Sequence, residues 1–144
     1  DDKKINFGSD QDASIEYDED GDDQLKIGGA VTAFTNAVIG KTDTDTSNSG
    51  SVTLDFDANQ NFVLTLTGAV TLANPSTEKV GQSGFIAFIQ DGTGSRAVTL
   101  GTDYETAGGS GLTLTATAGA TDLVPYVVVA ANRVLLGTPQ LAFS

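Results

Sequence analysis

Residues 61–68 read Asn-Phe-Val-Leu-Thr-Leu-Thr-Gly, and this stretch decides the fold class. Phe62, Leu64 and Leu66 alternate with one Val and two Thr, and a period of two places them on one face of a β-strand. The same alternation recurs over residues 52–57 and 112–115. Each segment therefore predicts a strand that buries one face and presents a polar face to solvent.

Two other stretches, residues 85–89 (Phe-Ile-Ala-Phe-Ile) and 127–131 (Val-Val-Val-Ala-Ala), are apolar on both strand faces. Such runs predict central strands that are covered on both sides. Residues 134–136 follow the second run closely and are expected to form a hairpin with it. Gly, Asn and Asp separate the strands, and no segment has the pattern of a helix of three turns. The sequence predicts an all-β chain, with an antiparallel, jelly-roll-like β-sandwich in its C-terminal part.

The composition excludes several classes of chemistry. The 144 residues, 39% of them hydrophobic, are enough to bury a core without disulfides or metals. Because the chain has no Cys and no His, disulfides, thiolate or His-zinc sites and His-based catalytic triads are excluded, and no cofactor is expected. A net charge of −12 predicts no direct contact with nucleic acid. The longest apolar stretch, residues 123–131, contains a Pro and is far shorter than the about 20 residues of a membrane span.

Charge and composition divide the chain into three parts. Residues 1–28 form an acidic N-terminal segment, residues 29–51 a connecting region, and residues 52–144 the β-sandwich domain. Within the connecting region, residues 30–39 are rich in Val, Phe, Ile and Thr and favour a strand. Residues 41–50 are polar throughout and predict an extended, exposed loop or linker.

The N-terminal segment predicts a β-hairpin, because residues 14–18 and 24–27 each alternate apolar with polar positions. A two-residue turn at residues 20–21 would place the two apolar pairs on opposite faces. Pairing Tyr17 with Leu25 places them on one face instead, and Ile15 then pairs with Ile27. This register requires an odd number of loop residues, so we predict three or five, with a bulge. A lone hairpin is marginal in water, and this one is expected to lie against something else.

The C-terminal part resembles a structural domain of tailed-bacteriophage virions that occurs in decoration proteins and at the ends of fibres. The motifs that carry the resemblance occur in order: NFxLTLTG at 61–68, TLANP at 71–75, GQxG at 81–84, QDGTGSR at 90–96, GG at 108–109, AxD at 120–122, and an apolar strand at 124–129. Residues 7–18 also resemble the opening of marine phage virion proteins. The resemblance implies an antiparallel sandwich, commonly trimeric, attached to a particle surface and without catalytic residues. The family often has an aromatic residue, commonly Trp, before the Gly-Gly pair, whereas the nearest here is Tyr104.

Acidic residues cluster at Asp18, Asp20 and Asp22, and oxygen ligands at alternate positions suit a calcium ion. The EF-hand pattern fails, because Asp23 stands where that loop needs Gly and Gly29 where it needs Glu. A solvated turn is the favoured interpretation over a calcium site.

Two other sites have a functional and a structural interpretation. Asp55 and Asp57 are two residues apart and share a strand face, as a glycosidase pair can, but a polar outer face is favoured. The Gly-rich residues 92–95 lack the Lys and the following helix of a phosphate-binding loop, and they predict a β-hairpin turn. Arg96 and Asp122 flank apolar strands and are predicted to form a structural ion pair.

The most plausible attachment surface consists of the apolar residues of the N-terminal segment, because the hairpin has little else to bury. These residues are Phe7, Ile15, Tyr17, Leu25 and Ile27. The alternative is that they fold onto their own β domain.

Three functions are compatible with these features. The first is a non-enzymatic virion protein on the capsid surface, a homotrimeric decoration (cement) protein that binds the major capsid protein and stabilises the phage head. The second is a tail or head-fibre tip, an adhesin that binds host surface glycans. The third is a polysaccharide hydrolase, which the modest length of the chain disfavours. Neither nucleic acid nor a membrane is expected as a partner.

Overall fold

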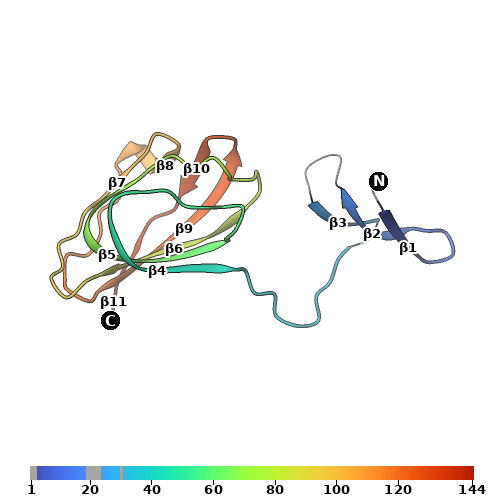
Figure 1. The fold of residues 1–144 in the computed structure, drawn as a ribbon, viewed down its shortest axis with the longest axis horizontal. Helices are drawn as coiled ribbons and strands as arrows, with labels where there is room; N and C mark the ends of the chain where they lie inside the picture. Colours follow the sequence, from blue (N-terminus) through green and yellow to red (C-terminus); the bar gives the residue numbers. More distant parts are fainter. Residues whose placement is uncertain (1–2, 19–23, 30) are drawn as a thin grey trace. The chain divides into compact units, whose positions relative to one another are not determined.

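The computed structural model describes residues 3–18, 24–29 and 31–144, and these residues form β-strands, loops and one short 3-10 helix (Figure 1). The all-β prediction is confirmed. The chain divides into two compact units, residues 1–39 and residues 40–144, and each is described by itself. None of the described residues belongs to a helix long and apolar enough to cross a bilayer.

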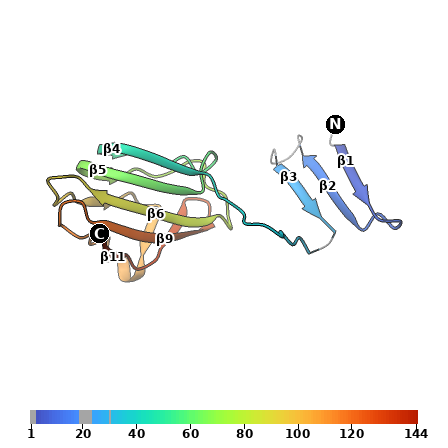
Figure 2. The ribbon, with the colours of Figure 1, turned by 90° about the horizontal axis from the view of Figure 1, so that it is seen from below.

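The N-terminal unit is an antiparallel sheet with the strand order β1-β2-β3 (Figure 2). Its strands are β1 (Lys3–Phe7), β2 (Ala13–Asp18) and β3 (Gln24–Gly28). β2 and β3 are the predicted hairpin. β1 adds a third strand, in which Ile5 pairs with Ile15 of β2.

The register predicted for the hairpin is confirmed. Tyr17 pairs with Leu25, and the next pair on the same face joins Ile15 to Ile27. Asp18 pairs with the first residue of β3, so the five residues 19–23 join the strands, an odd number as predicted. The bulge predicted for this loop lies outside the described residues.

The strand predicted over residues 30–39 is wrong for the part of it that is described, because residues 31–39 have no strand pairing. Val31, Phe34 and Ile39 follow no period of two, so no single face of an extended chain would collect them. All three are exposed. Composition alone therefore does not make this segment a strand.

The second unit is the β domain, a curved sheet with the strand order β4-β5-β6-β9-β10-β8, in which β7 pairs with β5 and β11 with β9 (Figure 1). Its elements are β4 (Thr42–Val52), β5 (Asn61–Leu72), β6 (Ser83–Gln90), β7 (Val98–Leu100), β8 (Tyr104–Thr106), η1 (Ala107–Gly109), β9 (Thr121–Ala130), β10 (Arg133–Leu136) and β11 (Gln140–Phe143).

The pairing in the β domain is mixed. β9 is antiparallel to β6, β10 and β11, and the predicted hairpin between residues 127–131 and 134–136 is confirmed as β9 and β10. β5 is parallel to β4, β6 and β7, and β8 is parallel to β10. Antiparallel pairing was predicted throughout, but the alternation of residues along a strand does not distinguish the two directions.

The loop or linker predicted over residues 41–50 is wrong, because most of it belongs to β4. β4 is an edge strand with mostly exposed side chains, so it lacks the apolar alternation by which strands are usually recognised. Asn48, only 2% exposed, anchors it at an irregularity in the ladder. Its Nδ2 donates hydrogen bonds to the carbonyl oxygens of Asp45 and Thr65, both at 3.1 Å.

The core lies between the two layers of a sandwich-like arrangement, as predicted, and β5 belongs to both layers. Its first half pairs with β6 at residues 62–66, and its last residues pair with β7 at 70–72. Phe62, with no exposed surface, packs edge-on against Phe56 and lies near Tyr126, with ring centroids 5.1 Å and 6.5 Å away. The finer assignment to the jelly-roll type stays a prediction.

The prediction that residues 127–131 are covered on both sides is wrong. Val128 is buried, but Val127 and Val129 of β9 are 37% and 38% exposed. β9 is central in the order of strands, and one of its faces still points to solvent over these residues. A strand can therefore be central in this sheet and still leave one face exposed to solvent.

We expect Phe62→Ala to lower the free energy of unfolding by about 3–5 kcal/mol, since it leaves a cavity among buried aromatic rings. Urea unfolding followed by circular dichroism measures this loss. Val129→Ala, on the exposed face of β9, is the matched control and should cost less than about 1 kcal/mol. Equal losses in the two variants would contradict the position of the core.

Candidate functional site

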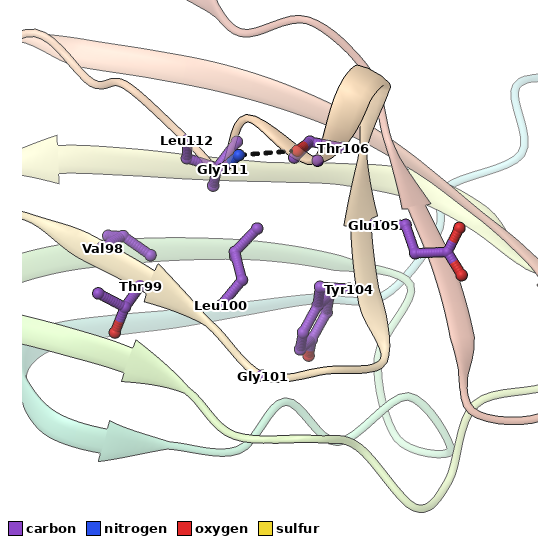
Figure 3. Close-up of a pocket in the computed structure, with 10 residues that line it drawn as sticks. Val98, Thr99, Leu100, Gly101, Tyr104, Glu105, Thr106, Gly111 and Leu112 are labelled. Atoms are coloured by element: carbon purple, nitrogen blue, oxygen red, sulfur yellow. Dashed lines mark hydrogen bonds between the residues drawn. The ribbon is translucent and has the colours of Figure 1, made fainter.

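A hollow of about 600 Å³ opens in the β domain between β7, β8 and the chain that follows η1 (Figure 3). Val98 and Leu100 of β7 lie on one side, and Leu112 lies on the other. A second hollow of about 290 Å³ shares Val98 and Leu112 with the first and continues along residues 95–97 and 113–116. Together they form one groove, called here the β7 groove, between residues 95–101 and residues 111–116.

The first wall of the β7 groove is a strand with one paired edge. Within the described chain, β7 pairs only with β5. The Val70 amide donates to the Ala97 carbonyl at 2.9 Å, and the Gly101 amide donates to the Leu72 carbonyl at 2.7 Å. Because successive residues of a strand direct their backbone groups to opposite edges, the amides and carbonyls of residues 98 and 100 point away from β5. A ligand in the groove can use these groups.

The opposite wall, residues 111–116, is extended chain without strand pairing, so the strand predicted over residues 112–115 is wrong. Three glycines with positive φ, Gly108 (69°), Gly109 (66°) and Gly111 (72°), turn the chain back after β8. The Gly111 amide donates to Thr106 Oγ1 at 2.9 Å, which fixes the start of the wall (Figure 3). Leu112 packs partly against the core.

The polar side chains of the β7 groove are hydroxyls, the carboxylate of Glu105 and the guanidinium of Arg96. Thr99 is exposed and shares a 2.8 Å hydrogen bond with Thr71. Glu105 lies at the rim, where Arg133 Nε donates to its Oε1 at 2.7 Å, and this hydrogen bond lowers the pKa of the Glu105 carboxyl. The groove therefore offers hydrogen-bond donors and acceptors beside apolar side chains.

Tyr104, the aromatic residue nearest the Gly-Gly pair, contributes to the groove through its ring. It is only 5% exposed, and its hydroxyl is buried without a hydrogen-bond partner among the described residues. Burial raises the pKa of the Tyr104 hydroxyl, and the charges of Glu78 and Asp103 raise it further. Tyr104 therefore stays neutral and presents little ring surface for stacking.

The ion pair predicted between Arg96 and Asp122 is wrong. Asp122 is 1% exposed and accepts hydrogen bonds from the Thr115 amide (2.5 Å), Thr115 Oγ1 (2.8 Å) and the Ala142 amide (2.8 Å). It stands opposite Phe88 in the ladder of β6 and β9, on the buried side of the sheet. Backbone donors from two neighbouring segments satisfy this carboxylate, and one of those segments is the groove wall.

Arg96 pairs instead with Asp91, five residues before it. Its Nη2 lies 2.8 Å from Asp91 Oδ2, and Asp91 Oδ1 also accepts hydrogen bonds from the amides of Thr93 and Gly94. The hydrogen bond from Arg96, together with these backbone bonds, lowers the pKa of Asp91 from 3.8 to about 2. The Asp91 carboxylate therefore holds the loop of residues 91–96 closed.

The hairpin turn predicted at residues 92–95 is also wrong, because the strands on its two sides, β6 and β7, do not pair with each other. The Gln90 side chain instead bridges the loop, with Oε1 accepting from the Arg96 amide at 2.8 Å and Nε2 donating to the Arg96 carbonyl at 3.0 Å. Gln90 is only 3% exposed. The loop reaches the β7 groove through Arg96.

Asp55 and Asp57 do not share a strand face, because β4 ends at Val52 and a turn follows. Asp55 Oδ1 accepts hydrogen bonds from the amides of Asp57 (3.1 Å) and Ala58 (3.2 Å). Asp57 Oδ1 lies 3.6 Å from Lys79 Nζ on the surface. The first carboxylate therefore organises the turn, and the two do not form a paired site.

The structure brings the predicted attachment residues together on one face of the N-terminal sheet. Ile15 lies between Ile5 and Ile27 in a row across the three strands, and Tyr17 and Leu25 form the next pair on that face. Sequence reasoning missed Ile5, although it alternates with Phe7. The attachment role of Phe7, Ile15, Tyr17, Leu25 and Ile27 stays a prediction.

Asp18, the described member of the calcium candidate, forms an ion pair with Lys26 of the neighbouring strand. Asp20 and Asp22 lie outside the described residues. Within the part of the chain that the structure describes, no three acidic side chains are grouped so as to hold a metal ion.

Comparison with known protein families gives one match. Residues 49–130, more than half of the chain, match the family described as "Putative phage tail fibre C-terminal domain". This range begins in β4 and ends with β9, and it contains β7, β8 and both walls of the groove. Searches of curated proteins and of solved structures give no match.

We expect Asp91→Asn to lower the melting temperature at pH 7 and to reduce its dependence on pH in acid. The folded-state pKa of Asp91 lies below its ordinary value, so its contribution to stability is present above pH 4 and is lost as the pH falls towards about 2. Thermal unfolding at pH 7, 4, 3 and 2 measures this change.

The matched control is Asp57→Asn, since the ion pair of Asp57 with Lys79 is well exposed. Exposed pairs contribute little, so this variant should follow the wild-type pH profile. An Asp91→Asn variant that loses as much stability in acid as the wild type would contradict the role of the carboxylate.

Proposed function

Because the chain belongs to the family of phage tail fibre C-terminal domains and is a component of a virion, we propose that it is the tip of a fibre that binds host surface glycans. The β7 groove is the binding site. The observation that carries the proposal is this groove, which lies within the matched residues and is lined by exposed polar groups and apolar side chains.

The size and lining of the β7 groove suit a carbohydrate. Sites for small ligands commonly have volumes of about 300–1,000 Å³, and the larger hollow has about 600 Å³. A sugar ring presents hydroxyls around its rim and C–H groups on its faces. The hydroxyls can bond to Thr99, Thr106 and the free backbone edge of β7, while the C–H groups contact Leu100 and Leu112.

The charge of the protein narrows the class of glycan. The chain carries a net charge of −12, and the two charged side chains that line the groove, Glu105 and Arg96, are each in an ion pair, with Arg133 and Asp91. The negative electrostatic field of such a protein repels anionic polymers. The proposed ligand is therefore a neutral surface polysaccharide and not a polysialic or strongly phosphorylated one.

A second candidate is the capsid decoration protein, a homotrimer bound to the major capsid protein. The apolar face of the N-terminal sheet favours it, because a small anchoring unit is what a surface-bound protein requires. Gold-labelled antibody against the β domain separates the two candidates on intact virions. Label on the tail or on a head fibre supports the fibre tip, and label spread over the shell supports the decoration protein.

We expect Thr99→Arg to weaken binding to host cells at least tenfold, or by about 1.4 kcal/mol, because the long side chain fills the β7 groove. Binding of the fluorescently labelled chain to host cells, and to neutral polysaccharide purified from them, measures this loss. Thr99 is exposed, so an arginine has room there, and circular dichroism of the variant checks that the loss of the Thr99 hydroxyl leaves the fold intact.

The matched control is Thr53→Arg, the same substitution at an exposed position that lines neither hollow of the groove. It should bind as the wild type does. A Thr99→Arg variant that keeps full binding would show that the host surface is bound elsewhere or not at all.

A further inference from the structure

We propose that strand β11 controls the β7 groove through the buried carboxylate of Asp122. The groove wall and β11 donate hydrogen bonds to the same carboxylate, so a ligand in the groove favours the docked position of β11, and docked β11 favours the ligand. The inference rests on the proposed function, because it concerns the regulation of that binding site. β11 itself lies outside residues 49–130, which match the fibre family.

The contact that the two segments share is a single oxygen atom. Asp122 Oδ1 accepts hydrogen bonds from Thr115 Oγ1 and from the Ala142 amide, both at 2.8 Å, while the Thr115 amide donates to Oδ2. Asp122 is 1% exposed, so its charge depends on these donors instead of on water. If the Ala142 donor is lost, the carboxylate has to turn or admit water to replace it, and either change disturbs its bonds to Thr115.

A β-bulge in β11 directs a backbone amide to this carboxylate. Gln140 pairs with Leu123, and Phe143 pairs with Thr121. Two residues of β11 therefore stand opposite the single residue between those partners, Asp122. An extra residue of this kind changes the direction of groups that would otherwise join the ladder. The amide of the second bulge residue thus reaches a side chain on the buried side of the sheet.

That second residue, Ala142, is held in a strained conformation. Its φ is 62°, in the left-handed region that residues with a Cβ seldom adopt. Such strain persists only where the surrounding structure imposes it, and it is frequent in ligand clamps and switch regions. The hydrogen bond to Asp122 offsets the strain, so β11 is docked by a bond whose loss releases it.

β11 has few other contacts that hold it in place. None of its four side chains is buried, and Leu141 and Phe143 are 52% and 53% exposed. The buried core of the β domain contains no residue of β11. A short strand with little apolar burial opens at a low free energy compared with the core. β11 can therefore leave β9 without unfolding the β domain.

Thr115 connects the carboxylate to the β7 groove. Its neighbours Leu114 and Ala116 line the second hollow, whereas Thr115 does not. The Thr115 side chain points to Asp122 instead. The wall is also bonded at its two ends, to β8 and to the loop before β7, so Thr115 sets its position between them. A movement of the carboxylate therefore changes the shape of the groove.

Hydrogen exchange of the full chain without ligand tests the coupling from the side of β11. Ala142→Pro removes the donor and fixes φ at about −65°, so β11 cannot dock as it does in the wild type. The amides of residues 113–116 should then exchange at least tenfold faster. The matched control is Ala142→Gly, which keeps the amide and adopts a positive φ without strain. Its wall should exchange as in the wild type.

The same coupling is measured from the side of the wall, because coupling between two sites is reciprocal. Thr115→Val removes one donor to Oδ1 and leaves the carboxylate freer to turn, so the Ala142 amide should exchange at least tenfold faster. Thr113→Val is the matched control, since the Thr113 hydroxyl is not among the donors to Asp122. This pair of variants decides the question if Ala142→Pro does not fold.

Affinity for neutral host polysaccharide tests the effect on binding. Ala142→Pro should raise the dissociation constant at least tenfold, Ala142→Gly should leave it unchanged, and saturating polysaccharide should slow exchange of the wild-type Ala142 amide. Exchange that no variant alters, or faster wall exchange with unchanged affinity, would overturn the proposal. A wild type with no affinity for the polysaccharide would instead refute the proposed function, and the two exchange experiments would still decide whether β11 and the wall are coupled.

Discussion

The buried carboxylate of Asp122 is the constraint on which the functional end of the β domain depends. A charge that is 1% exposed is costly unless hydrogen bonds satisfy it, and Asp122 receives three of them from Thr115 and Ala142. These donors come from segments with little ladder pairing of their own, the wall formed by residues 111–116 and the short strand β11. A single core position on β9 therefore fixes two irregular segments, and one of them forms half of the β7 groove.

The other half of the β7 groove depends on the same kind of local polar bonding. Gln90 and Asp91 close the loop before β7 through their bonds to Arg96, so the short strand begins at a fixed point. β7 then uses one edge to pair with β5 and leaves the other to the groove. The site is thus a surface between two non-helical segments, each held by buried or half-buried side chains. Such a surface can hold a ligand by shape and hydrogen bonding, as the proposed fibre tip requires.

Sequence periodicity predicted β5, because Phe62 and its alternating neighbours have only one way to be buried. The same alternation predicted a strand over residues 52–57, and this was wrong, because β4 ends at Val52 although Leu54 and Phe56 are buried. The pairing of the N-terminal hairpin was also predictable, since a shift by one residue would place Tyr17 and Leu25 on opposite faces of the sheet. β4 was missed because an edge strand pairs through its backbone and needs no apolar face. The groove could not be predicted, because its walls come from ordinary Thr, Leu and Gly residues. The partners of Asp122 were missed for a related reason, since backbone amides leave no signature in the sequence.

The most direct test of the central claim, glycan binding in the β7 groove, is a nuclear magnetic resonance titration of the labelled chain with neutral host polysaccharide. Binding in the groove predicts that the amide signals of residues 98–101 and 111–116 shift together and saturably, while those of β4 and β6 stay unchanged. Shifts confined to other residues, or no shifts at a concentration at which the polymer binds virions, would contradict the claim.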